Sequence, residues 1–342
     1  MKRVSLKDIA QATNLSKTTV SFILNGKGEE NNISKDTIAK VLETARRLDY
    51  RPNILAKSLL SGRSNMIGLI VPRITDTFFA QIATEVEKEA GSHGYTVVYG
   101  SSEEQPEREQ KLIDTFTGQQ VDGLIIASSL RNEDGIRRLN AEKYPFVLID
   151  RYYPSVDTSH VTVDNEPASY RLVEKLIERG YRRIALVTIT PYLDLMQARA
   201  EGYRRALADH GIPYDDALVE EVEAGTMESG VQTIIDRLLT ITPKADAIYF
   251  TTHYLASLGF KCLKDRKVAI PQDMAVCCFG DSPYLELFEP SITAIPMPAT
   301  QMGKEATGIL LQQINSVRAK ESTPPTSAHV TLPLEIISRR SW

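Results

Sequence analysis

Hydrophobic residues in the first fifty positions recur at helical spacing in three short segments. In the first segment Leu6, Ile9 and Thr13 share one face, and in the second Val20 and Ile23 do so at about 100° per residue. The third segment has five apolar positions at this spacing: Ile38, Val41, Leu42, Ala45 and Leu48. A serine that can cap a helix precedes each segment: Ser5, Ser16 and Ser34. The pattern predicts a helix-turn-helix domain, in which the second helix of the motif lies in the DNA major groove.

The second segment, residues 16–26 (SKTTVSFILNG), carries an aromatic residue on its polar side. Phe22 falls next to Thr18, opposite the apolar side of the predicted helix. The same polar side carries Lys17, Ser21 and Asn25. As a core residue Phe22 would point the wrong way, so the predicted fold alone gives no reason for it.

Residues 51–63 (RPNILAKSLLSGR) follow the third predicted helix. Pro52 ends that helix, Asn53 can cap a short new one, and Gly62 can end it. A helix of this length is not stable alone in water. We therefore expect it to be ordered only when something packs on it.

From residue 66 onward, short apolar runs alternate with amphipathic segments. The predicted strands are residues 66–71, 95–100, 123–127, 146–150, 183–187, 247–251 and 275–280. The predicted helices between them include residues 78–92, 106–118, 165–179, 197–209 and 227–239. A further strand, a long helix and a last strand follow at the C-terminal end. This alternation indicates an α/β fold with parallel sheets, and its length suits two subdomains.

Charge is distributed unevenly along the 342 residues, although the whole chain has a net charge of only −4. Residues 1–63 contain 12 Lys and Arg against 6 Asp and Glu, whereas the remainder contains 28 against 38. A basic head on an acidic body indicates either a module that binds a polyanion or a solvated basic face. No apolar run reaches membrane-spanning length, and residues 1–11 lack the apolar stretch of a signal peptide. With three cysteines, an odd count, we expect a cytoplasmic protein without disulfides.

No catalytic motif accompanies these patterns. The sequence lacks a G-x-G-x-x-G motif after a strand, a Walker loop and a G-x-S-x-G motif. Its five histidines form no i, i+4 pair and no cluster with cysteines. The acidic stretch 215–225 is interpreted as solvated surface. We therefore expect no enzymatic function, no cofactor and no metal.

Taken in order, several motifs resemble the lactose/galactose-repressor (LacI–GalR) family of bacterial regulators. They begin with SLKDIAQATNLSKTTVSFILNG and YRPNILAKSLLSGRSNMIGLIVP, and continue through VDGLIIAS, VLIDR, VTVDN, LIERGYRRIALV, RAEGYRRAL, IPQDMAVCCFGD and LPLEIISRRS. The resemblance covers nearly the whole chain. It implies a DNA-binding head at residues 1–50, a hinge helix and linker at 51–63, and a two-lobed effector-binding and dimerisation domain of the periplasmic-binding-protein type at 64–342.

The resemblance assigns DNA contacts within the head and hinge. Lys17, Thr18 and Phe22 match base-reading positions, where the ring of Phe22 can pack on thymine methyl groups. The positions that match phosphate contacts are Ser16, Thr19, Ser21 and Asn25. The hinge positions are Asn53, Lys57 and Leu59. Leu59 either enters the minor groove as an apolar wedge or packs against its own linker. The loop after residue 25 is longer than in the lactose repressor and holds the acidic Glu29 and Glu30, so the usual phosphate contacts of that turn are not assigned.

In the body, the resemblance places a small-molecule site between the lobes, beyond the carboxyl ends of the strands. The implied contacts are Asp76, Phe78, Phe79, Asp150, Arg199, His253, Tyr254 and Asp281. Alternatives remain for several: an N-cap for Asp76, a core position for Phe79, a surface salt bridge for Arg199 and a turn cap for Asp281. His253 and Tyr254 stand where many relatives have Asn-Asp, which indicates either a ligand with a ring or apolar part, or a partly closed pocket.

The resulting hypothesis is a regulator, expected to be a repressor, of a carbohydrate-related operon. It would act as a homodimer on palindromic operator DNA under the control of a sugar or sugar derivative. The alternatives are a solute-binding protein for transport and a regulator that acts through a protein co-regulator. The sequence does not identify the effector, its direction of action or the operator.

Overall fold

The computed structural model describes residues 4–50, 63–190, 194–223, 225–319 and 326–342. The chain divides into two compact units: Met1–Ser64, which contains the head, and Asn65–Trp342, which forms the body. The predicted hinge positions Asn53, Lys57 and Leu59 lie outside the described residues.

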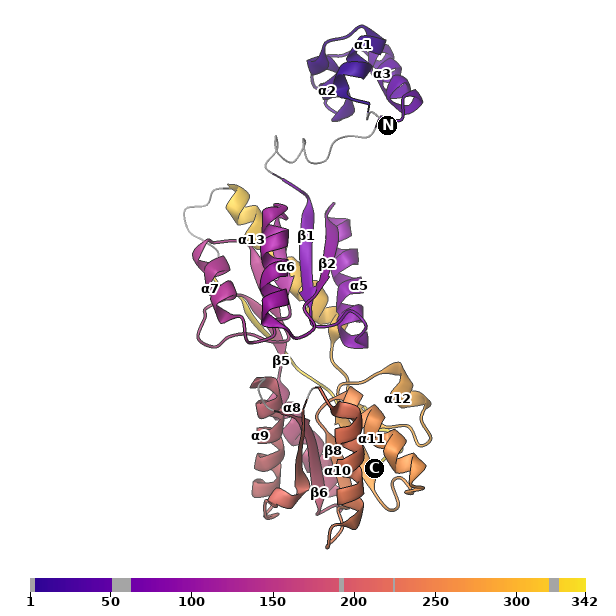
Figure 1. Cartoon of the computed structure of the whole chain (residues 1–342). Coiled ribbons are helices and arrows are strands. Elements are labelled where there is room, and N and C mark those ends of the chain that lie inside the picture. Colours follow the sequence, from indigo (N-terminus) through magenta and orange to yellow (C-terminus); the bar gives the residue numbers. More distant parts are fainter. Residues whose placement is uncertain (1–3, 51–62, 191–193, 224, 320–325) are drawn as a thin grey trace. The chain divides into compact units, whose positions relative to one another are not determined.

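Three helices form the head: α1 (Leu6–Thr13), α2 (Lys17–Leu24) and α3 (Lys35–Arg47) (Figure 1). Two of the predicted caps are clear, since Ser16 Oγ accepts from the backbone N–H of Thr19 and Ser34 Oγ from that of Thr37. The apolar faces meet in a small core of buried residues: Ile9, Ala10, Val20, Ile23, Val41 and Ala45. The predicted three-helix head is therefore confirmed.

One position of the predicted third helix was assigned to the wrong side. Leu42 was placed on the inward face, but it is 38% exposed. Val41 is fully buried, and the next residue along a helix is turned from it by about 100°. Three short helices bury only a narrow stripe of α3, and Leu42 lies outside it.

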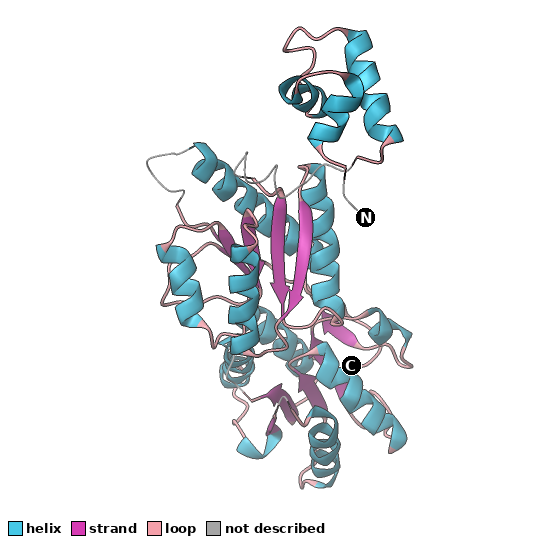
Figure 2. Ribbon diagram, turned by 45° about the horizontal axis from the view of Figure 1, so that its top comes forward, coloured by secondary structure: helices cyan, strands magenta, loops and turns pink. Residues whose placement is uncertain are grey.

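The first lobe of the body is built on a six-stranded sheet with the order β11-β5-β4-β3-β1-β2. Its strands are β1 (Met66–Val71), β2 (Thr96–Ser101), β3 (Gly123–Ile126), β4 (Phe146–Ile149), β5 (His160–Val163) and β11 (His329–Leu332). Every paired neighbour runs parallel. Helices cover both faces of the sheet (Figure 2): α5 (Thr77–Ser92) and α13 (Ala299–Ala319) on one, α6 (Pro106–Gly118) and α7 (Glu133–Ala141) on the other.

The second lobe is built on a five-stranded parallel sheet with the order β10-β9-β8-β6-β7. Its strands are β6 (Ile184–Ile189), β7 (Val219–Val222), β8 (Ala247–Phe250), β9 (Ala275–Phe279) and β10 (Thr293–Ile295). Helices α8 (Asn165–Glu178) and α9 (Asp194–Asp209) pack on one face, and α10 (Met227–Thr240) and α11 (His253–Asp265) on the other. The predicted α/β class with parallel sheets is confirmed, and all seven predicted strands are present with ends within two residues.

The acidic stretch 215–225, interpreted as solvated surface, is so only in part: Asp216, Glu221 and Glu223 are exposed, but Glu220 is not. It contains a 3-10 turn at Asp216–Leu218 and the edge strand β7. Glu220 is only 8% exposed because Arg237 of α10 pairs with its carboxylate. The sequence of β7, Val-Glu-Glu-Val, conceals the strand because its buried positions are Glu220 and Val222, so that polar and apolar residues do not alternate.

The chain passes between the two lobes three times: after β5, after β10 and after β11. The third passage returns to the second lobe, where Ile337 forms an antiparallel bridge with Ala294 of β10. Within the described ranges, no helix has the length and apolar character needed to cross a membrane. Nor do the described residues bring together three or more His, Cys, Asp or Glu side chains that could hold a metal ion.

Candidate functional site

The outward face of α2 presents a row of polar side chains. Lys17 and Thr18 are exposed at its first turn, directly after the cap formed by Ser16. At the other end, Asn25 Nδ2 donates to the carbonyl oxygen of Ser21 at 2.9 Å. The N-terminal turn therefore offers free polar groups together with the positive end of the helix dipole, both of which favour contact with a polyanion.

Phe22 lies on this face and not in the core of the head. Its side chain is partly exposed, and it stands outside the cluster of apolar residues that the described part of the head buries. Val20 and Ile23, on either side of it in the chain, are both buried. The structure thus agrees with the orientation inferred from helical spacing, and the ring is available for contact with a partner.

The loop after α2 is an ordered turn that projects two carboxylates. The backbone N–H of Ile33 donates to the carbonyl of Gly28 at 3.0 Å, and Asn31 Nδ2 donates to the carbonyl of Lys27 at 2.8 Å. Glu29 and Glu30 are exposed at its tip. The turn therefore holds two negative charges close to the end of α2.

In the body, a cavity of about 390 Å³ lies between the lobes, beyond the carboxyl ends of strands from both sheets. All eight residues predicted for the effector site line it: Asp76, Phe78, Phe79, Asp150, Arg199, His253, Tyr254 and Asp281. They come from segments far apart in the chain, and parallel topology brings them together because strand ends meet at one edge.

Asp150 follows β4 in a left-handed backbone conformation with φ of 68°. The residue is 7% exposed, and its Oδ1 atom is buried without a hydrogen-bond partner in the described structure. Burial raises the pKa of this carboxyl, against the lowering effect of Arg151 and Arg199. A strained backbone and an unsatisfied carboxylate oxygen at a cavity wall are both features of binding sites.

Arg199 of α9 is 5% exposed, so the alternative of a surface salt bridge is wrong. Its Nε donates to Asn165 Oδ1 at 2.9 Å and its Nη1 to the carbonyl of Thr251 at 2.8 Å. The guanidinium lies 3.7 Å from the centre of the Phe279 ring. Burial lowers the pKa of Arg199 to about 10. Nη2 has no acceptor among the described residues, which leaves it able to donate to a ligand.

Asp76 and His253 face each other across the cavity from the two lobes. Asp76 caps α5, since its Oδ1 accepts from the backbone N–H of Phe78 at 2.9 Å, and the same oxygen is 4.0 Å from His253 Nε2. Gly280 has φ of +81°, and a Cβ there would lie 2.9 Å from His253 Nδ1, so the glycine makes room for the ring. Burial lowers the pKa of His253, while Asp76 acts to raise it.

Asp281 lies at the cavity wall with its carboxylate already paired. Arg339 Nη2 donates to Oδ2 at 2.6 Å and Nη1 to Oδ1 at 3.1 Å, while the backbone N–H of Ser282 donates to Oδ1 at 2.8 Å. Phe79 is 5% exposed and belongs to the core of the first lobe, although its ring also reaches the cavity. For both residues, the structural and the ligand-facing interpretations hold together.

Sequence reasoning missed a second charged pair in the cavity. Arg151 donates through Nη1 and Nη2 to the two carboxylate oxygens of Glu104 at 2.7 and 2.9 Å. Arg151 directly follows Asp150, so its place beside the site could have been inferred. Glu104 comes from a loop after β2 with φ of 59°, and nothing in its sequence surroundings distinguishes it.

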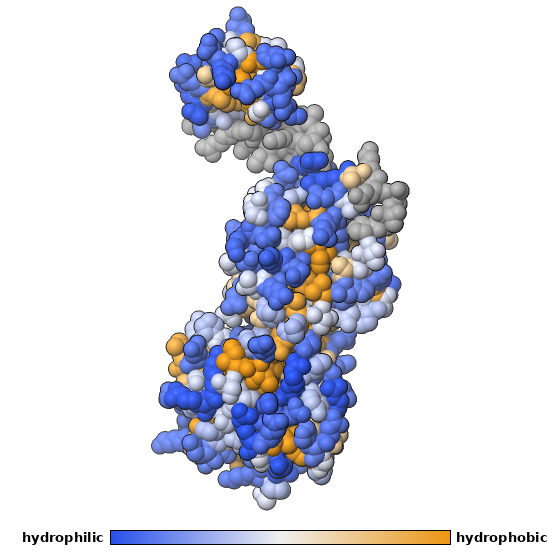
Figure 3. Space-filling view, turned by 180° about the vertical axis from the view of Figure 1, so that it is seen from behind, coloured by the Kyte–Doolittle hydropathy of each residue, from blue (hydrophilic) through white to orange (hydrophobic). Residues whose placement is uncertain are grey.

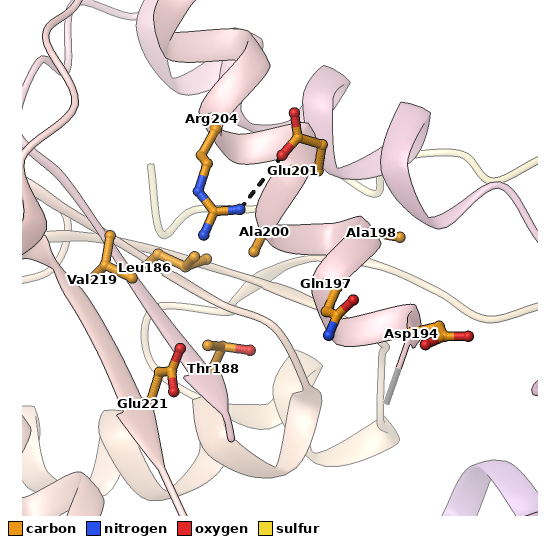
Figure 4. Close-up of a pocket in the computed structure, with 10 residues that line it drawn as sticks. All are labelled: Leu186, Thr188, Asp194, Gln197, Ala198, Ala200, Glu201, Arg204, Val219 and Glu221. Atoms are coloured by element: carbon orange, nitrogen blue, oxygen red, sulfur yellow. Dashed lines mark hydrogen bonds and ion pairs between the residues drawn. The ribbon is translucent and has the colours of Figure 1, made fainter. Parts of the chain in front are cut away.

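A second hollow, of about 580 Å³, lies within the second lobe between α9 and the strands β6 and β7 (Figure 4). Gln197, Glu201 and Arg204 extend from the helix over Thr188 and Glu221 of the strands, and Arg204 pairs with Glu201 at 3.5 Å. This hollow is lined from one lobe only, and its charged residues are exposed. The interlobe cavity is therefore the better candidate for a regulatory ligand.

Two family models match the chain. Residues 5–53 match the family of bacterial regulatory proteins described as the lacI family. Residues 64–335 match the family described as periplasmic binding proteins and the sugar binding domain of the LacI family. The match of residues 5–53 to a family of regulatory proteins favours a regulator over a solute-binding protein for transport.

Curated relatives align over nearly the full length. Catabolite control protein A of Priestia megaterium is 31% identical over 99% of both chains. The HTH-type transcriptional regulator DegA of Bacillus subtilis (strain 168) is 26% identical over 99% of this chain and 98% of its own. These relatives are transcription regulators, in agreement with the expectation that the protein is not an enzyme.

Solved structures show the same architecture. A complex described as transcriptional regulator CelR with cellobiose has a TM-score of 0.72 and 25% identity, covering 99% of this chain and 100% of its own. The transcription regulator CcpA of Lactococcus lactis has a TM-score of 0.71 and 27% identity over 81% of this chain and 98% of its own.

Proposed function

The chain belongs to the LacI family of bacterial transcription regulators, and on this premise we propose that it is a repressor controlled by a small molecule in the interlobe cavity. The genes that it regulates would serve carbohydrate metabolism, as the names of its relatives suggest. The effector would be a sugar or sugar derivative, the ligand class named for the cellobiose complex. We place its action in the cytoplasm, where operator DNA is found.

The observation that carries this proposal is a pair of unsatisfied groups at the cavity wall. Asp150 Oδ1 is a buried acceptor without a donor, and Arg199 Nη2 is a donor without an acceptor in the described structure. Leaving a buried polar group unpaired costs about 1–3 kcal/mol, so a ligand that satisfies both is favoured. Adjacent hydroxyl groups can donate to a carboxylate and accept from a guanidinium at once.

DNA reading is proposed for the outward face of α2. Lys17 and Thr18 would form hydrogen bonds with base edges, and the ring of Phe22 would pack on thymine methyl groups. Ser16, Thr19, Ser21 and Asn25 would contact phosphates and set the register, with the hinge residues Asn53, Lys57 and Leu59 at the operator centre. Thr18 and Phe22 lie one turn apart on one side of the helix, as base readers must.

A homodimer is proposed as the acting species, with the head (residues 1–50), hinge (51–63) and body (64–342) as its parts. Hydrophobic residues come to the surface of the body in patches (Figure 3). Leu287 of α12 (Pro283–Leu287) is 79% exposed, and Tyr99 of the edge strand β2 is 42% exposed. Exposed apolar side chains of this size support burial against a second copy. Two heads would then read a palindromic operator.

The test combines DNA binding with a ligand screen. Selection of bound sequences from a randomised palindromic library should yield a preferred sequence. Fluorescence anisotropy should show that the affinity of the protein for this sequence falls steeply as the salt concentration rises. A thermal-shift screen of sugars, sugar phosphates and purines should find ligands that raise the melting temperature by mass action and change operator affinity. Binding without sequence preference, or without salt dependence, would contradict the proposal.

A further inference from the structure

Positive and negative side chains line the interlobe cavity in nearly equal number. The described residues of the lining include three arginines, four acidic residues and no lysine: Arg73, Arg151 and Arg199, and Asp76, Glu104, Asp150 and Asp281. An anionic ligand needs a cation that is not already neutralised, because a charge that leaves water without a partner is costly to bind. The partners of the three arginines therefore decide whether this cavity can accept an anion.

Glu104 neutralises Arg151 at the cavity. Arg151 donates through Nη1 and Nη2 to the two carboxylate oxygens of Glu104 at 2.7 and 2.9 Å, and Nη1 also donates to the carbonyl of Ser128 at 3.1 Å. The side chain of Arg151 is only 8% exposed and that of Glu104 is 24% exposed. A paired guanidinium with this two-point geometry is held in one orientation. Arg151 is thus a buried cation whose charge is already compensated.

The turn that carries Glu104 has an unusual backbone conformation. Glu103 and Glu104 have φ of 52° and 59°, in the left-handed region that residues other than glycine seldom adopt. The backbone N–H of Glu103 donates to the carbonyl of Pro72 at 2.8 Å, and Arg131 Nη2 donates to the carbonyl of Glu104. Strained backbone of this kind is found at binding sites, where surrounding contacts hold it. The fold therefore fixes the backbone of Glu104 beside Arg151.

The other two arginines do not take the place of Arg151 as anion sites. Arg199 uses two of its N–H groups within the protein. Burial lowers the pKa of Arg199 while the charge of Asp150 acts to raise it, so the two side chains are close enough to interact. An anion that approached Arg199 would also meet the carboxylate of Asp150. Arg73 is exposed, so water and salt screen its charge.

We propose, resting on the proposed effector site, that Glu104 determines specificity by making the cavity select a neutral sugar over a sugar that carries a carboxylate or phosphate. The carboxylate of Glu104 takes the place beside Arg151 that an anionic group of a ligand would need. Without this carboxylate, Arg151 is a buried cation lacking its partner, and an anionic ligand that pairs with it is favoured.

Matched sugars test the proposal on the full-length wild-type protein by isothermal titration calorimetry. Glucose and glucuronate, like galactose and galacturonate, differ in one hydroxymethyl group that is replaced by a carboxylate, and glucose 6-phosphate carries a phosphate at the same position. We expect the neutral sugar of the pair that binds best to bind about 10-fold or more tightly than its anionic partners. Tighter binding of an anionic partner would overturn the proposal.

The variant Glu104→Gln keeps the volume of the side chain and removes its charge. It should shift the ratio of anionic to neutral affinity by about 10-fold or more in favour of the anion. Glu133→Gln is the matched control, because it removes the partner of the half-exposed Arg137 and neither residue lines the cavity. A folded Glu104→Gln protein with the wild-type ratio would overturn the role of Glu104. If this variant does not fold, the wild-type comparison decides alone.

A thermal-shift titration with inorganic phosphate separates this proposal from the proposed function. Phosphate should raise the melting temperature of Glu104→Gln more than that of the wild-type protein or of Glu133→Gln, since the head is the same in all three. The double variant Glu104→Gln with Arg151→Gln should lose the added response. Equal responses in all proteins would overturn the role of Glu104, whereas sugars that neither bind nor change operator affinity would overturn the proposed function.

Discussion

The face of α2 and the interlobe cavity differ in how far apart in the sequence their functional groups lie and in how deeply those groups are buried. The head carries its proposed DNA contacts within ten consecutive residues, on one exposed helix face around Lys17 and Phe22. The cavity gathers its contacts from residues 76 to 281, and its central groups, Asp150 and Arg199, are almost fully buried. The proposed DNA face is exposed and polar, whereas the proposed ligand site is built on desolvated groups that keep a hydrogen-bonding atom unpaired in the described structure.

This difference predicts how each region responds to substitution. Residues on the α2 face contribute little to the core of the head, so changing them should alter DNA binding without altering stability. The buried side chains that line the cavity form hydrogen bonds with other residues of the body and also face the proposed ligand. Changing them should therefore alter ligand binding and stability together.

The largest effect is expected for Arg199→Ala. The substitution removes hydrogen bonds to Asn165 and Thr251 and leaves Asp150 buried without a neighbouring positive charge of α9. Breaking a buried charge network in this way costs about 3–5 kcal/mol, and ligand binding should be lost. Urea denaturation and calorimetry measure both. Arg204→Ala on the same helix is the control, since Arg204 is exposed and pairs only weakly with Glu201, and equal losses in the two variants would contradict the comparison.

A smaller effect with an opposite sign on stability is expected for Asp150→Asn. The buried carboxyl has a pKa raised above 3.8, so the stability it provides is full at lower pH and is lost as pH rises through the native pKa. The variant should gain stability relative to the wild-type protein as pH rises from about 4 to 7, measured by chemical denaturation. It should also bind the tightest-binding sugar about 10- to 100-fold more weakly, because a charge-assisted hydrogen bond is lost. A wild-type protein that gains stability over the variant with rising pH would refute this.

On the head, Lys17→Ala should weaken specific DNA binding by about 1–3 kcal/mol if the side chain reads a base edge. The melting temperature should stay unchanged, because Lys17 is exposed and makes no contact with the core of the head. Anisotropy titrations at several salt concentrations measure affinity and its salt slope. Lys35→Ala, at the same position of α3, is the control, and an equal loss there would indicate a general effect of charge.

The smallest effect is expected for the acidic turn. Changing both Glu29 and Glu30 to Gln removes two negative charges near the DNA-facing helix and should raise affinity for non-specific DNA a few-fold at low salt. The backbone hydrogen bonds of the turn do not involve these side chains, so the fold should be unaffected. Unchanged affinity at low salt would mean that the turn lies away from the DNA.

Much of this architecture could be predicted from the sequence, because local signals agree with the global fold. Serine caps and helical spacing predicted the three helices of the head, and apolar runs predicted seven strands of the body. Strand β7 was missed because two of its four residues are adjacent glutamates, and the pairing of Glu220 with Arg237 is not visible in sequence. Pairs such as Arg339 with Asp281 join residues 58 positions apart, and only the fold brings them together.

The central claim is that the outward face of α2, with Phe22, reads the operator. Selection of bound sequences from a randomised palindromic library, at fixed salt, compares the wild-type protein with Phe22→Ala and Leu42→Ala. Leu42 is the matched control, an exposed apolar residue of α3 that is 38% exposed and lies outside the predicted recognition face. Phe22→Ala should lose the preference for thymine at one position of each half-site and keep the others, while Leu42→Ala keeps them all. Identical sequence preferences for all three proteins would contradict the claim.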